Sequence, residues 1–405
     1  MYIKRALESV VLKMSRNFPV VLITGPRQTG KTTLLQMLKA DGRHYVTLDD
    51  PMLRQLAINE PSLFFERNPP PVIVDEIQYA PELLPYIKMH VDKQQNMGDF
   101  WLTGSQAFHL MKGVSESLAG RVGIINMLGL SNSELQGRES QVYTTDLKAL
   151  MAKAGQAKQQ TVMEIYDLIV KGSMPAVYTR ESITAEEFYS AYIQTYLQRD
   201  IKDLMQVGDE LAFLRFLTAT AARTGQLLNY AELAKDSEIS PPTAKQWFSI
   251  LVTSGIIKVV EPYFNNTLKR IIKAPKFYFL DTGIAAYLTR WHNPEVLEAG
   301  AMSGAFFETW VVSEIVKSYY NAGKQAPLYY YRDKEQKEID LIIHENGTLY
   351  PIEIKKSGNP SRSAIKNFSV LEKTGQKIGQ GNVICLTKDM LPIDRDNFFV
   401  PAWMI

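Results

Sequence analysis

One run of residues near the start of the sequence has the types and spacing of a phosphate-binding loop. The run is Gly25-Pro26-Arg27-Gln28-Thr29-Gly30-Lys31-Thr32. An apolar stretch, Val20 to Ile23, precedes it and a helix-forming stretch follows, which is the context that this pattern requires. Glycines allow backbone angles at which successive N–H groups converge on phosphate oxygens. We therefore predict an ATP site that extends to Thr33, in which Lys31 reaches the β- and γ-phosphates and Thr32 contacts Mg²⁺.

Two acidic residues after another apolar run could complete an ATPase site. Val72 to Val74 has the character of a buried parallel strand, and Asp75 and Glu76 follow it directly. We expect Asp75 to hold Mg²⁺ together with Thr32, and Glu76 to act as the base that activates water. The alternative is that the two acids cap the next helix.

A further strand-like run, Phe100 to Thr103, ends in the small and polar residues Gly104-Ser105-Gln106. Ser105 is a candidate catalytic residue, because Ser105 or Gln106 would reach the attacking water or the γ-phosphate. The alternative is an ordinary turn between a strand and a helix.

Size and composition predict a folded, cytoplasmic protein. The 405 residues are 45% hydrophobic and 22% charged, which at roughly 150 residues per domain suggests two or three domains. A net charge of +2 creates no global field for nucleic acid, so any such partner would need a local patch. The single cysteine, Cys385, lies in an apolar run and predicts a buried, reduced thiol. We find no signal peptide and no apolar run of the roughly 20 residues that a membrane span requires.

Changes in hydrophobic pattern divide the chain into regions of an α/β protein. Residues 1–150 alternate strand-like and helical stretches, as a P-loop domain does, and a linker from Lys153 to Gln160 leads to a helical connector at residues 161–207. Residues 208–290 have the order of a winged-helix domain. Residues 300–405 begin with a helix and continue as strands separated by turns.

The winged-helix region predicts a possible contact with nucleic acid. Ser240 suits the N-cap of a recognition helix that spans Thr243 to Leu251, where Lys245 and Gln246 offer long polar side chains. Cations also cluster in the expected wing, and such a cluster would bind phosphates without sequence preference. These wing cations are Lys269, Arg270, Lys273 and Lys276. The alternative is a winged helix used for packing or protein contact.

The C-terminal region contains a strong hairpin signal. Asn346-Gly347 between two apolar runs favours a two-residue turn with both residues at positive φ. In that register Asp340 lies opposite Glu353, close enough for the two carboxylates to share a divalent metal, and Lys355 lies on the same face. Repulsion between the acids would raise one carboxyl pKa unless a metal or Lys355 offsets it. Pro351 argues for an edge or a bulge that would shift this register.

Taken together, these motifs resemble a prokaryotic family of AAA-type ATPases that carry a C-terminal domain with a restriction-endonuclease-like core. The matching elements are the loop Gly25 to Thr33, Leu48-Asp49-Asp50, Val72 to Gln78, Leu102 to Ser105, and Ser117 to Arg121. The resemblance implies Walker A, Walker B and sensor roles for these residues. It also implies that Arg121 acts either as an arginine finger across a subunit interface, which would require an oligomer, or as a structural anchor.

The Asp340 and Glu353-x-Lys355 pattern is similar to the PD-(D/E)xK nuclease core. The resemblance implies that Asp340 and Glu353 hold Mg²⁺, with Glu308 as a further ligand, and that Lys355 assists the attacking water. We therefore expect a Mg²⁺-dependent ATPase coupled to DNA or RNA binding, with nuclease action in question. The alternatives are an ATP-controlled protein-interaction switch with a degenerate nuclease-like domain, and a DNA-binding regulator with negligible ATP turnover.

Overall fold

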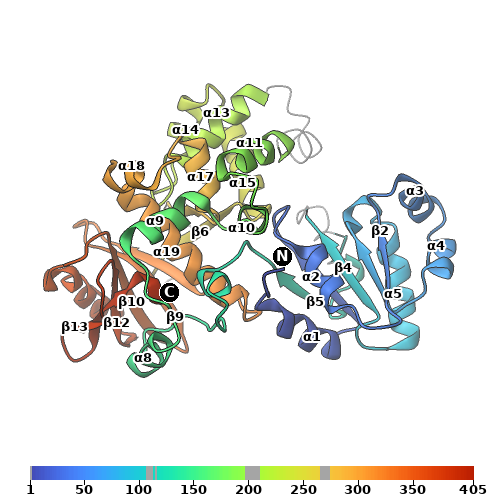
Figure 1. The fold of residues 1–405 in the computed structure, drawn as a ribbon, viewed down its shortest axis with the longest axis horizontal. Helices are drawn as coiled ribbons and strands as arrows, with labels where there is room; N and C mark the ends of the chain where they lie inside the picture. Colours follow the sequence, from blue (N-terminus) through green and yellow to red (C-terminus); the bar gives the residue numbers. More distant parts are fainter. Residues whose placement is uncertain (1, 106–112, 115, 197–209, 265–273) are drawn as a thin grey trace. The chain divides into compact units, whose positions relative to one another are not determined.

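The computed structural model describes residues 2–105, 113–114, 116–196, 210–264 and 274–405. The chain folds as two compact units (Figure 1). The first unit comprises residues 1–130, 253–255 and 320–324. The second unit comprises residues 131–252, 256–319 and 325–405.

The first unit contains a five-stranded parallel sheet in the order β2-β3-β4-β1-β5. Its strands are β1 (Val20–Thr24), β2 (His44–Thr47), β3 (Val72–Asp75), β4 (Phe100–Gly104) and β5 (Val122–Asn126). The β-branched runs of the sequence predict strands at Val20–Thr24, Tyr45–Leu48, Val72–Val74 and Phe100–Thr103, and these four strands are confirmed, with ends that differ by at most one residue. Because β4 lies between β1 and β3, the ends of the three strands that lead to the predicted ATPase motifs are neighbours.

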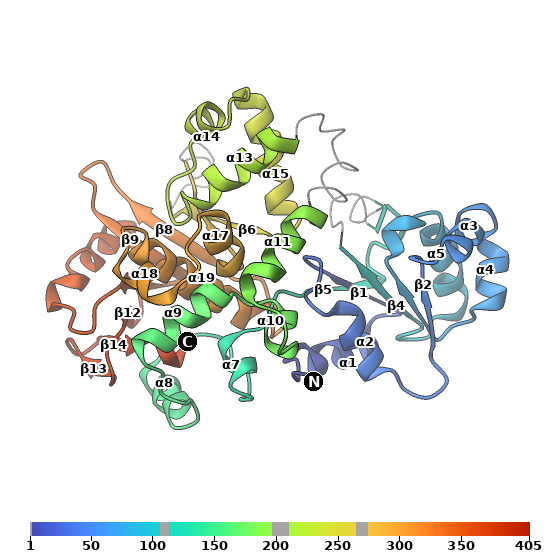
Figure 2. The same cartoon turned by 45° about the horizontal axis from the view of Figure 1, so that its top comes forward.

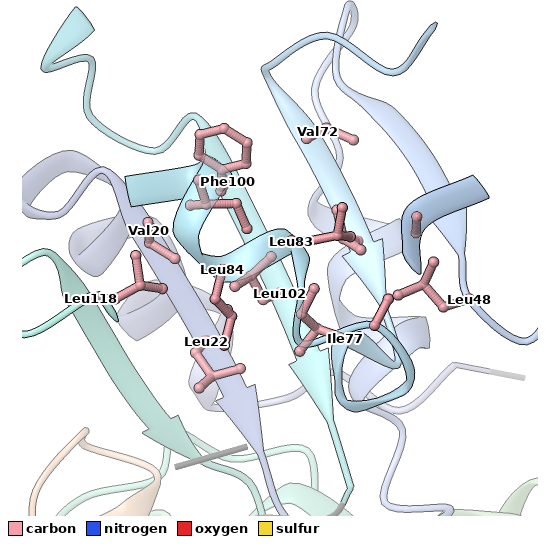
Figure 3. Packing of buried hydrophobic residues seen from close by; sticks show 14 of the residues in the cluster. Val20, Leu22, Leu48, Val72, Ile77, Leu83, Leu84, Phe100, Leu102 and Leu118 are labelled. Carbon is pink, nitrogen blue, oxygen red and sulfur yellow. The ribbon is translucent and has the colours of Figure 1, made fainter. Parts of the chain in front are cut away.

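Helices cover both faces of this sheet because alternate residues of its buried strands point to opposite sides. Val21, Ile23 and Trp101 pack with α1 (Leu7–Asn17) and α2 (Lys31–Leu38). Figure 3 shows residues of the other face, where Val20, Leu22 and Leu102 pack with the remaining helices. These are α3 (Pro51–Asn59), α4 (Pro61–Arg67), the short η1 (Ile77–Tyr79) and α5 (Leu83–Gln94).

The second unit combines many helices with one large mixed sheet. Among the helices, α9 lies beside both α17 and α18 (Figure 2). The first helices are α7 (Asn132–Leu135), α8 (Leu147–Ala154), α9 (Val162–Lys171), α10 (Pro175–Thr179), α11 (Ala185–Tyr196) and α13 (Glu210–Ala221). Then follow α14 (Tyr230–Asp236), α15 (Pro241–Thr253), α17 (Thr282–Leu288), α18 (Pro294–Ala299) and the largely buried α19 (Ser303–Tyr320). Three short 3₁₀ segments are η3 (Arg362–Ile365), η4 (Phe368–Thr374) and η5 (Ala402–Met404).

The sheet of the second unit has the order β13-β14-β12-β10-β9-β8-β6-β7, with β11 beside β10. Its strands are β6 (Ile257–Pro262), β7 (Lys276–Phe279), β8 (Leu328–Arg332), β9 (Glu338–Glu345), β10 (Thr348–Lys355), β11 (Lys377–Ile378), β12 (Gly381–Cys385), β13 (Leu391–Pro392) and β14 (Asn397–Pro401). Strand β6 pairs with β7 from Ile257 to Val260 and with β8 through Glu261 and Pro262. Cys385 is buried, as predicted.

The hairpin of β9 and β10 has the predicted turn and register. Asn346 and Gly347 have φ values of 50° and 72°. The ladder pairs Thr348 with Glu345 and continues to Ile352 opposite Leu341. Pro351 pairs within this ladder, and on its other side β10 changes partner from β11 to β12. The bulge lies instead in β8. Pro351 falls between the residues of β10 that pair with β11 and those that pair with β12, where a missing N–H interrupts no ladder on that side.

The alternation of apolar residues in this hairpin predicts a buried face on which Ile339, Leu341 and Ile343 lie against Ile352 and Ile354, and all five residues are buried. Ile342, on the opposite face of β9, is fully buried as well. The reason is that β9 is an interior strand, covered on both faces.

Residues 208–290 contain the predicted order of helices followed by a hairpin. The Oγ atom of Ser240 accepts a hydrogen bond from the N–H of Thr243 at the start of α15, as expected of an N-cap. Three of the proposed wing cations, Lys269, Arg270 and Lys273, lie outside the described residues. The pattern around Arg270 to Lys273 also predicts a strand of the wing, and this run lies outside the described residues as well. Lys276 is described, but it is buried and ion-paired, so the expectation of an exposed wing cation there is wrong.

The predicted linker from Lys153 to Gln160 also needs correction. Lys153 lies in the last turn of α8 and is buried, and the side chain of Gln160 accepts a hydrogen bond from Asn132. The N–H of Lys158 donates to Gln136 and the side chain of Gln159 donates to the carbonyl of Lys388, so this segment is held by contacts with other parts of the chain. Among the described residues, no helix is both long and apolar enough to cross a bilayer.

Candidate nucleotide-binding site

The phosphate-binding loop joins β1 to α2, and its glycines occupy positions that other residues would not tolerate. Gly25 has a φ of 146°, and a β-carbon there would lie 2.0 Å from the carbonyl oxygen of Met127. Gly30, the N-cap of α2, has a φ of 93°. The predicted requirement for glycine therefore has two causes, backbone conformation at both positions and close approach of a neighbouring segment at Gly25.

The side chains of the loop make contacts that define its shape. The Nζ atom of Lys31 is buried and donates to the carbonyl oxygens of Gly25 and Pro26, at 3.0 and 2.8 Å. Thr29 donates to the same carbonyl of Pro26, and Arg27 donates to the hydroxyl of Tyr79. Gln28 and Thr33 are exposed.

The carboxylate of Asp75 is the centre of a hydrogen-bonded cluster at the end of β3. Thr32 Oγ1 donates to both carboxylate oxygens, at 2.9 and 3.0 Å. The hydroxyls of Tyr45 and Thr103 donate to it as well. Burial and the adjacent carboxylate raise the pKa of Tyr45 to about 12. A hydroxyl and a carboxylate that converge in this way are oxygen donors of the kind that Mg²⁺ prefers, so the predicted pair fits this metal.

Glu76 adopts an unusual backbone conformation that turns its side chain toward β4. Its φ is 59°, which is uncommon outside glycine, and its N–H donates to Thr103 Oγ1 at 3.1 Å. Its Oε2 accepts hydrogen bonds from the Nε2 of Gln78 and, at 3.3 Å, from the hydroxyl of Ser105. The structure thus brings Asp75, Glu76 and Ser105 together. Gln106 lies outside the described residues.

Sequence reasoning missed Tyr45 as a member of this site, and it placed Thr103 and Gln78 within the matching elements without assigning their contacts to Asp75 and Glu76. Tyr45 is 30 residues from Asp75 along the chain and has no motif of its own. Gln78 had a signal, because the 3₁₀ turn that follows Glu76 returns its amide to the carboxylate two residues earlier.

The hydrogen bonds of the Arg121 side chain are made with residues outside this cluster. Its Nε atom pairs with Asp92 at 2.5 Å, and its Nη1 donates to the carbonyl of Ala119. Both side chains of the ion pair are partly exposed, so its net contribution to stability is small. These contacts fit the anchoring interpretation of Arg121.

A second cluster of charges surrounds the C-terminal acids. Lys355 pairs with Glu353 at 2.5 Å and with Asp340 at 3.5 Å. Asp340 also accepts a hydrogen bond from the N–H of Ile354, so its side chain binds the neighbouring strand directly. Burial and the charge of Asp340 raise the pKa of Glu353 to about 8, although Lys355 opposes this effect. The expected repulsion is present, and Lys355 does not fully offset it.

The third predicted metal ligand, Glu308, is already engaged. Its carboxylate accepts from the hydroxyl of Tyr278 at 2.7 Å and from Lys276 at 3.4 Å, and Lys276 also pairs with Glu338 at 2.6 Å. Among the described residues, no group of three or more acids, histidines or cysteines is arranged to hold a metal ion. Glu353 Oε2 is buried and has no hydrogen-bond partner within the part of the chain that the structure describes, so a metal at the Asp340–Glu353 pair fits better than one that includes Glu308.

Three regions of the chain match models of known domain families. Residues 17–136 match an AAA domain, residues 163–295 match the domain of unknown function DUF8612, and residues 303–405 match the domain of unknown function DUF4143.

Uncharacterized proteins of Mycobacterium bovis and Mycobacterium tuberculosis are similar over most of the chain. Each is 29% identical over 346 residues, which cover 85% of this chain and 72% of the relative.

Several solved structures are similar at low sequence identity. The Walker-type ATPase of Pyrococcus abyssi is 14% identical, with a TM-score of 0.45 over 71% of this chain and 96% of that one. The RuvB Holliday junction branch migration motor of Thermotoga maritima is 16% identical, with a TM-score of 0.28 over 62% and 85%. AMPPCP-bound DnaA of Aquifex aeolicus is 13% identical, with a TM-score of 0.29 over 62% and 89%. The domain match and the geometry of the loop agree, and the chain contains an AAA-type P-loop ATPase domain.

Proposed function

We propose that the chain hydrolyses ATP with Mg²⁺ held by Thr32 and Asp75 and with Glu76 as the general base. The observation that carries this proposal is the convergence at the ends of β1, β3 and β4. There the Thr32 hydroxyl meets the Asp75 carboxylate, and Glu76 follows directly with its carboxylate against Ser105.

Each residue has a defined task in this reaction. Lys31 exchanges its bonds to the Gly25 and Pro26 carbonyls for phosphate oxygens, and the N–H groups of the loop hold the remaining phosphate charge. Bound Mg²⁺ would offset the charge that develops on the β- and γ-phosphates. Glu76 takes a proton from water as the water oxygen bonds to the γ-phosphorus and the bond to the bridging oxygen breaks, which leaves ADP and phosphate.

Two substitutions test this proposal. Lys31→Ala should abolish ATP binding measured by titration calorimetry, whereas Glu76→Gln should retain binding and reduce phosphate release at least about 100-fold. Lys39→Ala is the matched control, because Lys39 is an exposed lysine at the end of the same helix. Turnover that survives Lys31→Ala would place the ATP site elsewhere.

A second candidate function concerns nucleic acid. We propose that the region from α13 to β7 is a winged helix that presents Lys245 and Gln246 of α15, both of which are exposed. ATP turnover should then rise when single- or double-stranded DNA or RNA is added, and Lys245→Ala with Gln246→Ala should reduce the effect. If no nucleic acid changes turnover, the ATP-controlled protein-interaction switch becomes the better proposal.

We also propose that the C-terminal domain is restriction-endonuclease-like, with Asp340, Glu353 and Lys355 as its active residues. The buried Oε2 of Glu353, which has no hydrogen-bond partner in the ranges that the structure describes, is the observation that favours this function over a purely structural cluster. Bound Mg²⁺ would supply a Lewis acid at Asp340 and Glu353, while Lys355 would orient the attacking water. Cleavage of DNA or RNA with Mg²⁺ or Mn²⁺ should stop in Asp340→Ala but not in Glu335→Ala, which alters an exposed acid. An uncut panel of substrates would favour the degenerate interpretation.

A further inference from the structure

Arg5 is a buried arginine that joins the phosphate-binding loop to the segment after β5. It lies before α1, and only 3% of the residue is exposed. Its Nη1 donates to the carbonyl oxygen of Thr29 at 2.8 Å. Its Nη2 donates to the carbonyls of Leu128 and Gly129, at 2.8 and 3.3 Å. One planar guanidinium therefore fixes two separate stretches of backbone relative to each other.

The bond to Thr29 determines where a phosphate-binding N–H points. In a trans peptide the carbonyl and the following N–H point in opposite directions. Because Arg5 binds the Thr29 carbonyl, the N–H of Gly30 points away from Arg5, and the loop presents it from the side opposite the guanidinium. Arg5 thus orients one peptide of the loop without contacting the nucleotide itself.

The segment held by the other side of the guanidinium also touches the start of the loop. Met127 donates its N–H to the carbonyl of Thr24 at 2.8 Å, and its own carbonyl is the group that excludes a β-carbon at Gly25. The first unit ends at Leu130, and the chain continues into the second unit at Ser131. There the N–H of Asn132 donates to the buried Glu314 of α19.

We propose that Arg5 is a positioning residue that couples the nucleotide state of the phosphate-binding loop to residues 127–130, and through them to the entry into the second unit. The proposal rests on nucleotide binding at this loop, as set out above. Rearrangement of the Thr29 peptide on phosphate binding shifts the Arg5 guanidinium, and the carbonyls of Leu128 and Gly129 follow. Residues 127–130 continue directly into Asn132, whose N–H binds Glu314 of α19. A shift of the Leu128 and Gly129 carbonyls is therefore passed along the backbone to these residues of the second unit.

Hydrogen–deuterium exchange tests this coupling in the full-length protein with Mg²⁺ and the non-hydrolysable analogue AMPPNP. In the wild type, the nucleotide should slow exchange in peptides that cover residues 25–33 and also in those that cover residues 127–136. In Arg5→Ala the dissociation constant should rise about tenfold, as expected for the loss of charge-assisted hydrogen bonds. At a nucleotide concentration that saturates this variant, protection of residues 25–33 should return, but protection of residues 127–136 should not.

Arg43→Ala is the matched control, because Arg43 is also partly buried in the first unit but stacks on Trp101 and donates to Asp99. This change should lower thermal stability without altering either response to AMPPNP. If circular dichroism shows that Arg5→Ala does not fold, Arg5→Lys replaces it, since a single ammonium cannot reproduce the forked contacts.

The outcomes separate the two proposals. Wild-type protection of residues 127–136 in the Arg5 variant, or its absence in the wild type, would overturn the coupling. AMPPNP binding that persists in Lys31→Ala would instead overturn the proposed nucleotide site. Loss of stability with unchanged coupling would reduce Arg5 to a structural residue.

Discussion

At the scale of single residues, the acids of the ATPase site are positioned by side chains outside the phosphate-binding loop. Asp75 receives hydrogen bonds from Thr32, Thr103 and Tyr45, and Glu76 receives them from Ser105 and Gln78. Orientation of this kind matters because a ligand or base held in one geometry has less freedom to lose when the transition state forms. Two of these partners allow direct tests.

Gln78→Ala should slow ATP hydrolysis without weakening ATP binding. The amide of Gln78 holds the Glu76 carboxylate and also donates to Ser105 at 3.3 Å, whereas its buried Oε1 has no partner among the described residues. Without the amide, Glu76 samples more orientations, and we expect kcat to fall about tenfold while KM changes little. Steady-state kinetics at saturating Mg²⁺ measure both values. A rise in KM at constant kcat would show that Gln78 acts on nucleotide binding instead.

Tyr45→Phe should increase the Mg²⁺ concentration needed for half-maximal turnover. The hydroxyl of Tyr45 donates to Asp75 Oδ2 at 2.9 Å, and loss of such a supporting bond to a metal ligand typically weakens metal affinity about tenfold. Turnover at saturating Mg²⁺ should remain close to that of the wild type. Tyr86→Phe in α5 is the control, since that tyrosine is exposed. An unchanged Mg²⁺ requirement would show that Tyr45 does not support the proposed metal site.

At the scale of elements, the sequence predicted the structures that depend on a few adjacent residues. It did not predict the contacts between residues that are far apart in the chain. The turn at Asn346-Gly347 and the loop from Gly25 to Gly30 follow from the backbone preferences of a few adjacent residues. The pairing of β6 with β8 and the contacts of Arg5 with Leu128 depend on residues far apart in the chain. No periodic pattern marks such pairs, because each partner alone is compatible with many surroundings.

Helix α8 contains Lys153, which the polar composition placed at the start of a linker but which is buried in the structure. Burial lowers the pKa of Lys153 to about 8 from its ordinary 10.5; the charge of Arg138 adds to this shift, and Glu314 opposes it. Between these two pH values the folded protein binds fewer protons than the unfolded chain, so the free energy of unfolding rises with pH. Below about pH 8 the buried lysine is charged in both states, and its full cost to stability is present.

Lys153→Met should therefore stabilise the protein at pH 7 and less so near pH 10. The lowered pKa corresponds to an upper limit of about 3 kcal/mol at pH 7. Urea unfolding at the two pH values measures the difference. Lys148→Met changes an exposed lysine of the same helix and should leave the pH dependence as it is in the wild type. A destabilised Lys153→Met protein at pH 7 would show that the ammonium makes a favourable contact that outweighs its burial.

At the scale of the whole molecule, the boundaries of the matched domain families do not coincide with the boundaries of the sheet. Strand β6 lies in the region matched at residues 163–295, and β8 lies in the region matched at residues 303–405. The two strands pair directly, so a single sheet spans both regions. We infer that these regions, although they match separate families, unfold together.

Val260→Ala tests that inference, because Val260 is fully buried in β6 and pairs with Lys276 of β7. Removing its two methyl groups should lower the free energy of unfolding by about 2 kcal/mol. If the sheet makes the second unit cooperative, hydrogen exchange should speed up both in α15 and in β10, which belong to different matched regions. Val259→Ala is the control, since Val259 is only half-buried in the same strand and should have a smaller effect. Faster exchange confined to α15 would mean that the region around β6 and β7 opens independently of the C-terminal strands.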